Sequence, residues 1–150
     1  MTVGSSPFGL AINGYASLAA RICLSAVYLY SGISKLVDVS AGMAEVAGLG
    51  LPAPGAFLAL TILVQIGGGL MVLVGLWTRL AAFVLLGFTV VATALAHNPL
   101  GLAGTEFQRQ ATTSLEHLAI AGGFLLLIAA GAGPISIDGW IARRRGPRTP

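Results

Sequence analysis

The sequence predicts an all-α integral membrane protein that folds as a four-helix bundle, and three observations support this prediction. Hydrophobic residues make up 56% of the 150 residues, compared with roughly 45–50% in soluble domains. Only 9% of the residues are charged, where about 25% is usual. Four long stretches carry almost no charge, and each can supply the about 20 apolar residues that a helix needs to cross the hydrocarbon core. The composition excludes a soluble globular domain, a disordered chain and a nucleic-acid-binding protein.

The uncharged stretches, trimmed at their prolines and glycines, give four predicted spans at residues 16–37, 55–76, 78–97 and 112–131. Pro52 and Pro54 cannot continue a helix and fit just before the second span. Gly75 is expected to end that span, and Thr78 is expected to cap the third. Backbone groups in lipid must be satisfied internally, so the four helices are expected to form a bundle.

The basic residues of the short loops predict how the bundle is oriented. Two of them, Lys35 and Arg109, lie on one side of the predicted membrane. Six lie on the other side: Arg21, Arg79, Arg143, Arg144, Arg145 and Arg148. Because cytoplasmic loops carry the excess of Lys and Arg, both termini are expected in the cytoplasm.

This orientation predicts the organisation of the chain. We expect an N-terminal cytoplasmic tail at residues 1–15, a membrane domain at 16–134 and a basic cytoplasmic tail at 135–150. The first part of the basic tail is expected to lie along the inner membrane surface, with Trp140 as an anchor.

The first span carries three polar residues at intervals of seven, Arg21, Tyr28 and Lys35. Seven residues are nearly two helical turns, so the three side chains share one face, beside Ser25 and Gly32. A charge at the bilayer centre costs roughly 2.5–3.5 kcal/mol, so this face is expected to point into the bundle. The alternative is that Arg21 and Lys35 simply reach towards the two opposite interfaces.

Gln65 lies near the middle of the second span, where its amide needs an interhelical partner. It is either structural, joining two helices, or part of a site. The small residues at 67–69 and 122–123 are expected to let helices approach closely. Cys23, the single cysteine, is expected to be a packing residue.

Four ionisable side chains from three spans are expected to meet near the outer interface. Lys35 is on the last turn of the first span, His97 ends the third, and Glu116 and His117 begin the fourth. Such a cluster could exchange protons, hold the carbonyl oxygens of a quinone, or form a structural ion-pair network. Metal or haem ligation is not expected, because Glu116 and His117 are adjacent and point about 100° apart on a helix.

A series of motifs runs in order through roughly residues 18–138. These are Arg21, YSGISKL at 30–36, QIGGGL at 65–70, GLWTR at 75–79, His97, LAIAGGFL at 118–125 and GAGPISID at 131–138. Together they resemble the DoxX family of small four-helix membrane proteins. Two positions depart from the family pattern: many relatives carry a glutamate where Gln65 stands, and a lysine–asparagine pair is common where Glu116 and His117 stand.

The resemblance implies a multi-pass protein of the bacterial cytoplasmic membrane that associates with membrane oxidoreductase systems. One hypothesis is therefore a membrane subunit or partner of a quinone-linked oxidoreductase, with the outer cluster at a quinone or proton-exchange site. The other is a non-catalytic membrane scaffold or small-solute carrier. The expected partners are the lipid bilayer, an oxidoreductase protein and a second copy of the chain. Whether the chain has an activity of its own stays open.

Overall fold

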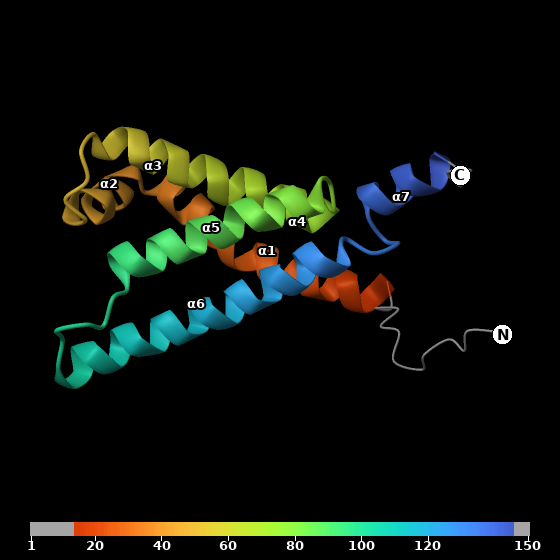
Figure 1. The fold of residues 1–150 in the computed structure, drawn as a ribbon. Coiled ribbons are helices and arrows are strands. Elements are labelled where there is room, and N and C mark those ends of the chain that lie inside the picture. Colours follow the sequence, from red (N-terminus) through yellow and green to blue (C-terminus); the bar gives the residue numbers. More distant parts are fainter. Residues whose placement is uncertain (1–13, 146–150) are drawn as a thin grey trace.

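The computed structural model describes residues 14–145, which form helices and connecting turns without a strand (Figure 1). The helices are α1 (Gly14–Val37), α2 (Val39–Gly48), α3 (Pro54–Leu63), the π-helical turn η1 (Val64–Gly68), α4 (Gly69–Val74), α5 (Thr78–Ala96), α6 (Gly104–Ala130) and α7 (Ile137–Arg144). The segments α3, η1 and α4 join into one long helix, Pro54–Val74. The predicted fold class is confirmed: α1, this joined helix, α5 and α6 are long and apolar enough to cross a membrane.

The outer surface of the bundle is apolar, as a lipid-facing surface should be. Tyr30 is 78% exposed, Leu63 is 68% exposed and Leu126 is 72% exposed. An apolar surface of this extent would be unstable in water but is matched to hydrocarbon. Cys23 also lies on this exposed face, so its expected packing role is wrong.

The structure corrects one boundary and adds one helix. The fourth spanning helix begins at Gly104 rather than at residue 112, and its first turns carry an ion pair between Glu106 and Arg109 at 2.5 Å. Hydropathy missed these turns because they are polar, although helical. The connection after the first span contains the helix α2. Asp38 caps this helix, because its carboxylate accepts from the amide of Ala41 at 2.9 Å. This N-cap, an aspartate just before an apolar segment, was the sequence signal for α2.

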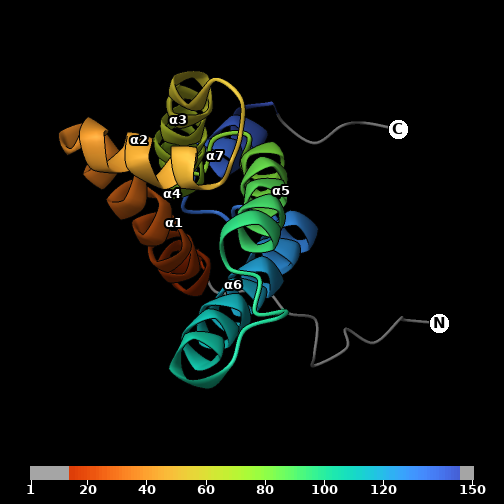
Figure 2. The same cartoon turned by 90° about the vertical axis from the view of Figure 1, so that its left-hand side faces the viewer.

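The helices diverge towards one end of the bundle. Helix α5 packs along α6, and α1 packs against α4. The buried core lies where these helices meet, and consists of Tyr28, Val72, Ala81, Ala82, Leu85, Phe124 and Leu127. Figures 1 and 2 show α5 and α6 separating from α2 and α3 at the opposite end. We call that end, which carries α2 and residues 97–103, the α2 end; the other is the α7 end.

The glycines of the spans allow close packing at some positions only. A Cβ placed on Gly68, Gly69 or Gly123 would lie 3.0 Å from a leucine side chain of a neighbouring helix. Gly67 and Gly122 face no atom within 4 Å. The expected close approach therefore holds for three of these five glycines.

Helix α7 is fastened to the turn between α4 and α5. The Asp138 carboxylate accepts hydrogen bonds from the amides of Trp77 and Thr78, both at 2.9 Å, and from the Thr78 hydroxyl at 2.8 Å. Gly75 ends α4 with a positive φ of 72°, as expected. The expected cap by Thr78 is wrong: the third span is capped by Asp138, a residue that is distant in sequence and reaches it only in the folded chain.

The basic residues separate between the two ends as the orientation argument requires. Arg21 bonds to carbonyls of α4, Arg79 bonds to the carbonyl of Ala129, and Arg143 bonds to the carbonyl of Pro134, all at the α7 end. Lys35 and Arg109 lie towards the α2 end. Arg148, the tail before residue 14 and the end of the basic tail lie outside the described residues. The orientation itself stays a prediction.

Cysteine labelling in whole cells tests this orientation. In a Cys23→Ser background, Gly48→Cys near α2 should react with a membrane-impermeant maleimide added outside, because the side with fewer Lys and Arg is extracytoplasmic. Ala142→Cys in α7 should react only after the membrane is permeabilised. The reverse labelling pattern would contradict the orientation. Both positions are on exposed or uncrowded backbone, so neither substitution should disturb the fold.

Candidate functional site

A cavity of about 470 Å³ lies between the diverging helices, towards the α2 end. Its walls come from α1, α2, α3, η1, α5 and α6. Most of the lining is apolar, and includes Val27, Phe57, Leu60, Val84, Phe88, Val91, Leu95 and Ile120. Cavities of a few hundred cubic ångströms with apolar walls and a few polar groups are typical sites for small molecules.

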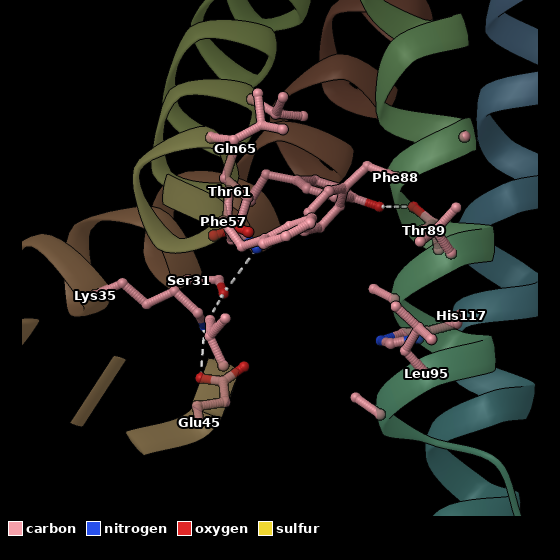
Figure 3. Close-up of a pocket in the computed structure, with 18 of the residues that line it drawn as sticks. Ser31, Lys35, Glu45, Phe57, Thr61, Gln65, Phe88, Thr89, Leu95 and His117 are labelled. Carbon is pink, nitrogen blue, oxygen red and sulfur yellow. Dashed lines mark hydrogen bonds and ion pairs between the residues drawn. The ribbon is translucent and has the colours of Figure 1, made fainter. Parts of the chain in front are cut away.

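One wall of the cavity carries a hydrogen-bonded polar group from α1, α2 and η1 (Figure 3). The Lys35 ammonium forms an ion pair with the Glu45 carboxylate at 3.0 Å and donates to the Ser31 hydroxyl at 3.3 Å. The Gln65 amide nitrogen donates to the same hydroxyl at 3.1 Å. Lys35 is thus held in place at the cavity, with a side chain that is only 14% exposed.

Gln65 is 6% exposed and is only partly satisfied. Its side-chain oxygen is buried and has no hydrogen-bond partner among the described residues. A buried polar atom without a partner costs about 1–3 kcal/mol, so its presence beside a cavity indicates a place where a ligand or water bonds. Gln65 therefore joins two helices through Ser31 and also lines a site; the two interpretations of this residue are not exclusive.

The local backbone explains why Gln65 reaches the cavity. It lies in η1, a π-helical turn that widens the second spanning helix for residues 64–68. Such turns are rare and often occur at functional sites, because the extra residue re-aims the side chains around it. Gly32 permits the approach of α1, since a Cβ there would lie 2.7 Å from Ile66 and 3.1 Å from the Cβ of Gln65.

The opposite wall carries a series of hydroxyl and imidazole groups on α1, α5 and α6. Tyr28 is hydrogen-bonded to the Thr89 hydroxyl, and both residues line the cavity. Thr93 does not line it but is hydrogen-bonded to Nδ1 of His117 at 2.7 Å. The His117 and His97 rings meet edge to face, with centroids 5.0 Å apart. Lys35 and His117 lie on facing walls in Figure 3.

The structure brings together three of the four residues of the expected cluster. Lys35, His97 and His117 all line the cavity. Glu116 does not join them: its side chain is exposed on the outside of α6, and Lys35 pairs with Glu45 instead. Adjacent residues of a helix point in different directions, so Glu116 and His117 could not both face inward.

The polar face of α1 points into the bundle, but only one end of that face lines the cavity. Ser17, Arg21, Ser25, Tyr28 and Gly32 are the buried residues of α1. Arg21 is only 1% exposed, so its guanidinium is held by protein groups and not by solvent. It donates to the backbone at the α7 end and does not line the cavity.

Sequence reasoning missed Ser31, Glu45, Thr61 and Thr89, which line the cavity. It also missed Thr93 and Gln110, which are hydrogen-bonded to the imidazoles of His117 and His97. Glu45 was placed in a loop because α2 was not recognised, and Gln110 was placed outside the fourth span. The sequence did hold one signal, because Ser31 and Lys35 are four residues apart and therefore share a helix face.

The polar groups define what this site can do chemically. The Lys35 ammonium and the hydroxyls of the cavity can donate hydrogen bonds to oxygen atoms of a ligand. The two imidazoles can do so when they are protonated, and the apolar walls hold a ring or chain. Within residues 14–145 no three His, Cys, Asp or Glu side chains gather closely enough to hold a metal ion. The geometry thus favours a neutral or anionic lipophilic molecule with oxygen acceptors.

Comparison with known proteins places this bundle in a family. The sequence model of the DoxX family matches residues 16–98, which include Lys35, Gln65 and His97. The chain belongs to the DoxX family. The match covers the first three spans, whereas His117 and Gln110 lie beyond it.

Three relatives of known name are similar over most of their length. Inner membrane protein YqjF of Escherichia coli is 34% identical over 81% of this chain and 88% of its own. Inner membrane protein YphA of the same organism is 25% identical over 81% of this chain and 86% of its own. Uncharacterized membrane protein Rv3486 of Mycobacterium tuberculosis is 32% identical over 85% and 82%. No solved structure matches the chain. With the four spanning helices, these relatives identify a multi-pass bacterial inner membrane protein.

Proposed function

We propose that this DoxX-family protein is a membrane subunit or partner of a quinone-linked oxidoreductase system, and that its cavity binds the quinone head group. The single observation that carries the proposal is the cavity itself, which combines apolar walls with polar groups on two facing sides. A quinone has the complementary chemistry, since its ring and side chain are apolar and its two carbonyl oxygens accept hydrogen bonds.

The residues present fit such a ligand. Lys35 is fixed by Glu45 and Ser31 and can donate to one carbonyl oxygen. His117, on the facing wall, can donate to the other when its Nε2 carries a proton. The unpartnered side-chain oxygen of Gln65 is an acceptor, so on the Lys35 side it can bond a hydroxyl of the reduced quinol rather than a quinone carbonyl. A bound quinone would supply two-electron, two-proton chemistry there, while the electrons would come from a partner oxidoreductase.

The quinone retained by the protein tests this proposal. The protein, purified in polymer discs that keep native lipid, should carry quinone that is detectable by chromatography and absorbance. Lys35→Met should lower the occupancy by about tenfold, because one charge-assisted hydrogen bond is worth about 1.5 kcal/mol or more. Loss of Lys35 leaves only Glu45, which is 57% exposed, so the bundle should stay folded.

Arg109→Met is the matched control, since Arg109 is the other basic residue towards the α2 end and does not line the cavity. Its quinone occupancy should equal that of the unsubstituted protein. Equal occupancy in the two variants, or phospholipid acyl chains in place of quinone, would contradict the proposal. A protein partner retained without any quinone would instead support the membrane-scaffold hypothesis.

A further inference from the structure

The rings of His97 and His117 lie in contact where the cavity approaches the α2 end. His97 follows the last residue of α5 and is partly exposed where the chain enters the 97–103 turn. His117 lies inside the cavity wall on α6. The edge-to-face contact of the two rings, 5.0 Å between centroids, joins the exposed residue to the one within the cavity.

The hydrogen bonds of the two rings assign their tautomers. His97 Nδ1 faces the Gln110 side-chain oxygen at 3.1 Å, so Nδ1 carries the hydrogen. The Thr93 hydroxyl donates its hydrogen to the carbonyl of Thr89 at 2.7 Å, and must therefore accept from Nδ1 of His117. In both neutral rings Nε2 is then the proton acceptor. The basic Nε2 of each ring is free of these bonds and can take up a proton.

We propose that His97 and His117 form a relay that exchanges protons between the water at the α2 end and the cavity. His97 takes up a proton at Nε2 from the water and passes it to Nε2 of His117. His117 then releases the proton into the cavity. The transfer between the rings takes place through a water molecule in the cavity that both rings line. Gln110 and Thr93 are positioning residues, because they fix the orientation of the rings and carry no proton themselves.

The cations around the relay are paired with carboxylates. Glu106 accepts from the Gln110 amide at 3.2 Å and pairs with Arg109 at the start of α6. Glu116 lies exposed next to His117 in sequence, and Lys35 with Glu45 faces His117 across the cavity. Neither Lys35 nor Arg109 is therefore an unpaired cation.

The relay would supply protons to a quinone in the cavity, so this role rests on the proposed function. Reduction of a quinone consumes two electrons and two protons, and each proton forms an O–H bond with a carbonyl oxygen. The electrons come from the partner oxidoreductase, and the relay supplies the protons from the side that the basic-residue excess predicts to be extracytoplasmic. Reprotonation of His97 from that water restores the relay.

Nuclear magnetic resonance of the ring nitrogens tests the relay without any turnover. The chain holds only two histidines, so ¹⁵N-histidine labelling gives ring signals from His97 and His117 alone. The measured quantity is the rate at which the ring proton of His117 exchanges with water in lipid discs. His97→Phe should slow this exchange by about tenfold or more, because exchange then requires a local opening of the bundle.

Gln110→Leu provides a second variant on the exposed side of the relay. It should also slow the exchange at His117, by a smaller factor, because the His97 ring loses its fixed orientation. Gln108→Leu is the matched control, since Gln108 is exposed on the same helix and contacts neither ring. Exchange in His97→Phe and Gln110→Leu within twofold of the unsubstituted rate would overturn the relay.

Quinone occupancy of the same samples separates this inference from the proposed function. If quinone is retained but the exchange rate of His117 does not depend on His97, the relay is wrong and quinone binding stands. If the exchange slows as expected and no sample retains quinone, the relay stands as a proton route into the cavity and the proposed function is wrong.

Discussion

Arg21→Met should lower the free energy of unfolding by about 2–5 kcal/mol, because two or more buried carbonyls would lose their donor. The Arg21 guanidinium donates to the carbonyls of Val72 at 3.3 Å and Leu73 at 2.7 Å, and also to that of Ile135. Two of these carbonyls lie in the last turn of α4, where the Val72 carbonyl also accepts from the Gly75 amide at 3.2 Å. The third belongs to the segment before α7, so one side chain joins three parts of the chain.

Reversible unfolding of the bundle in sodium dodecyl sulfate measures this loss. Arg79→Met is the control, since Arg79 lies at the same end but is exposed and makes a single bond of 3.3 Å to the carbonyl of Ala129. It should cost no more than about 0.5 kcal/mol. A loss for Arg21→Met no greater than that for Arg79→Met would show that the buried arginine is dispensable to the fold.

Asp138→Asn should detach α7 from the rest of the bundle and remove part of its acid sensitivity. The carboxylate accepts three hydrogen bonds from Trp77 and Thr78, and an amide in its place can accept at one oxygen only. Loss of these bonds to a charged acceptor should cost about 1.5–3 kcal/mol near neutral pH. Proteolysis of the tail after Ser136 and chemical unfolding measure the two effects.

The pH dependence follows from the pKa of Asp138. Burial raises this pKa, but the hydrogen bonds from Thr78 and Trp77 and the charge of Arg21 outweigh burial and hold it below its usual range. A carboxyl whose pKa is lowered in the folded state binds its proton more readily in the unfolded state. Its contribution to stability is therefore complete above the unfolded pKa of about 3.9 and is lost as the pH falls through the folded value.

The unsubstituted protein should thus lose stability below about pH 4, and Asp138→Asn should show a smaller loss over the same range. Glu116→Gln is the control, because Glu116 is exposed on α6 and should leave the acid profile unchanged. Identical acid profiles for the unsubstituted protein and Asp138→Asn would contradict the role of this carboxylate.

Local patterns determined which segments cross the membrane and which face of α1 is buried. Four long apolar stretches can be satisfied in lipid only as helices, so composition and length were sufficient to predict the bundle. The interval of seven that joins Arg21, Tyr28 and Lys35 fixed a shared face, because helical geometry depends on spacing alone. These features are properties of single segments.

The partners of the polar side chains were decided only by the tertiary structure. The sequence predicted that Lys35 lies close to Glu116, but in the folded chain Lys35 pairs with Glu45 of α2. Likewise, α5 is capped by Asp138 and not by Thr78. Both choices depend on how helices distant in sequence are placed against one another, which spacing within one helix does not contain. The cavity has the same origin: Lys35 and His117 face each other because the helices diverge towards the α2 end, and that divergence is a property of their packing.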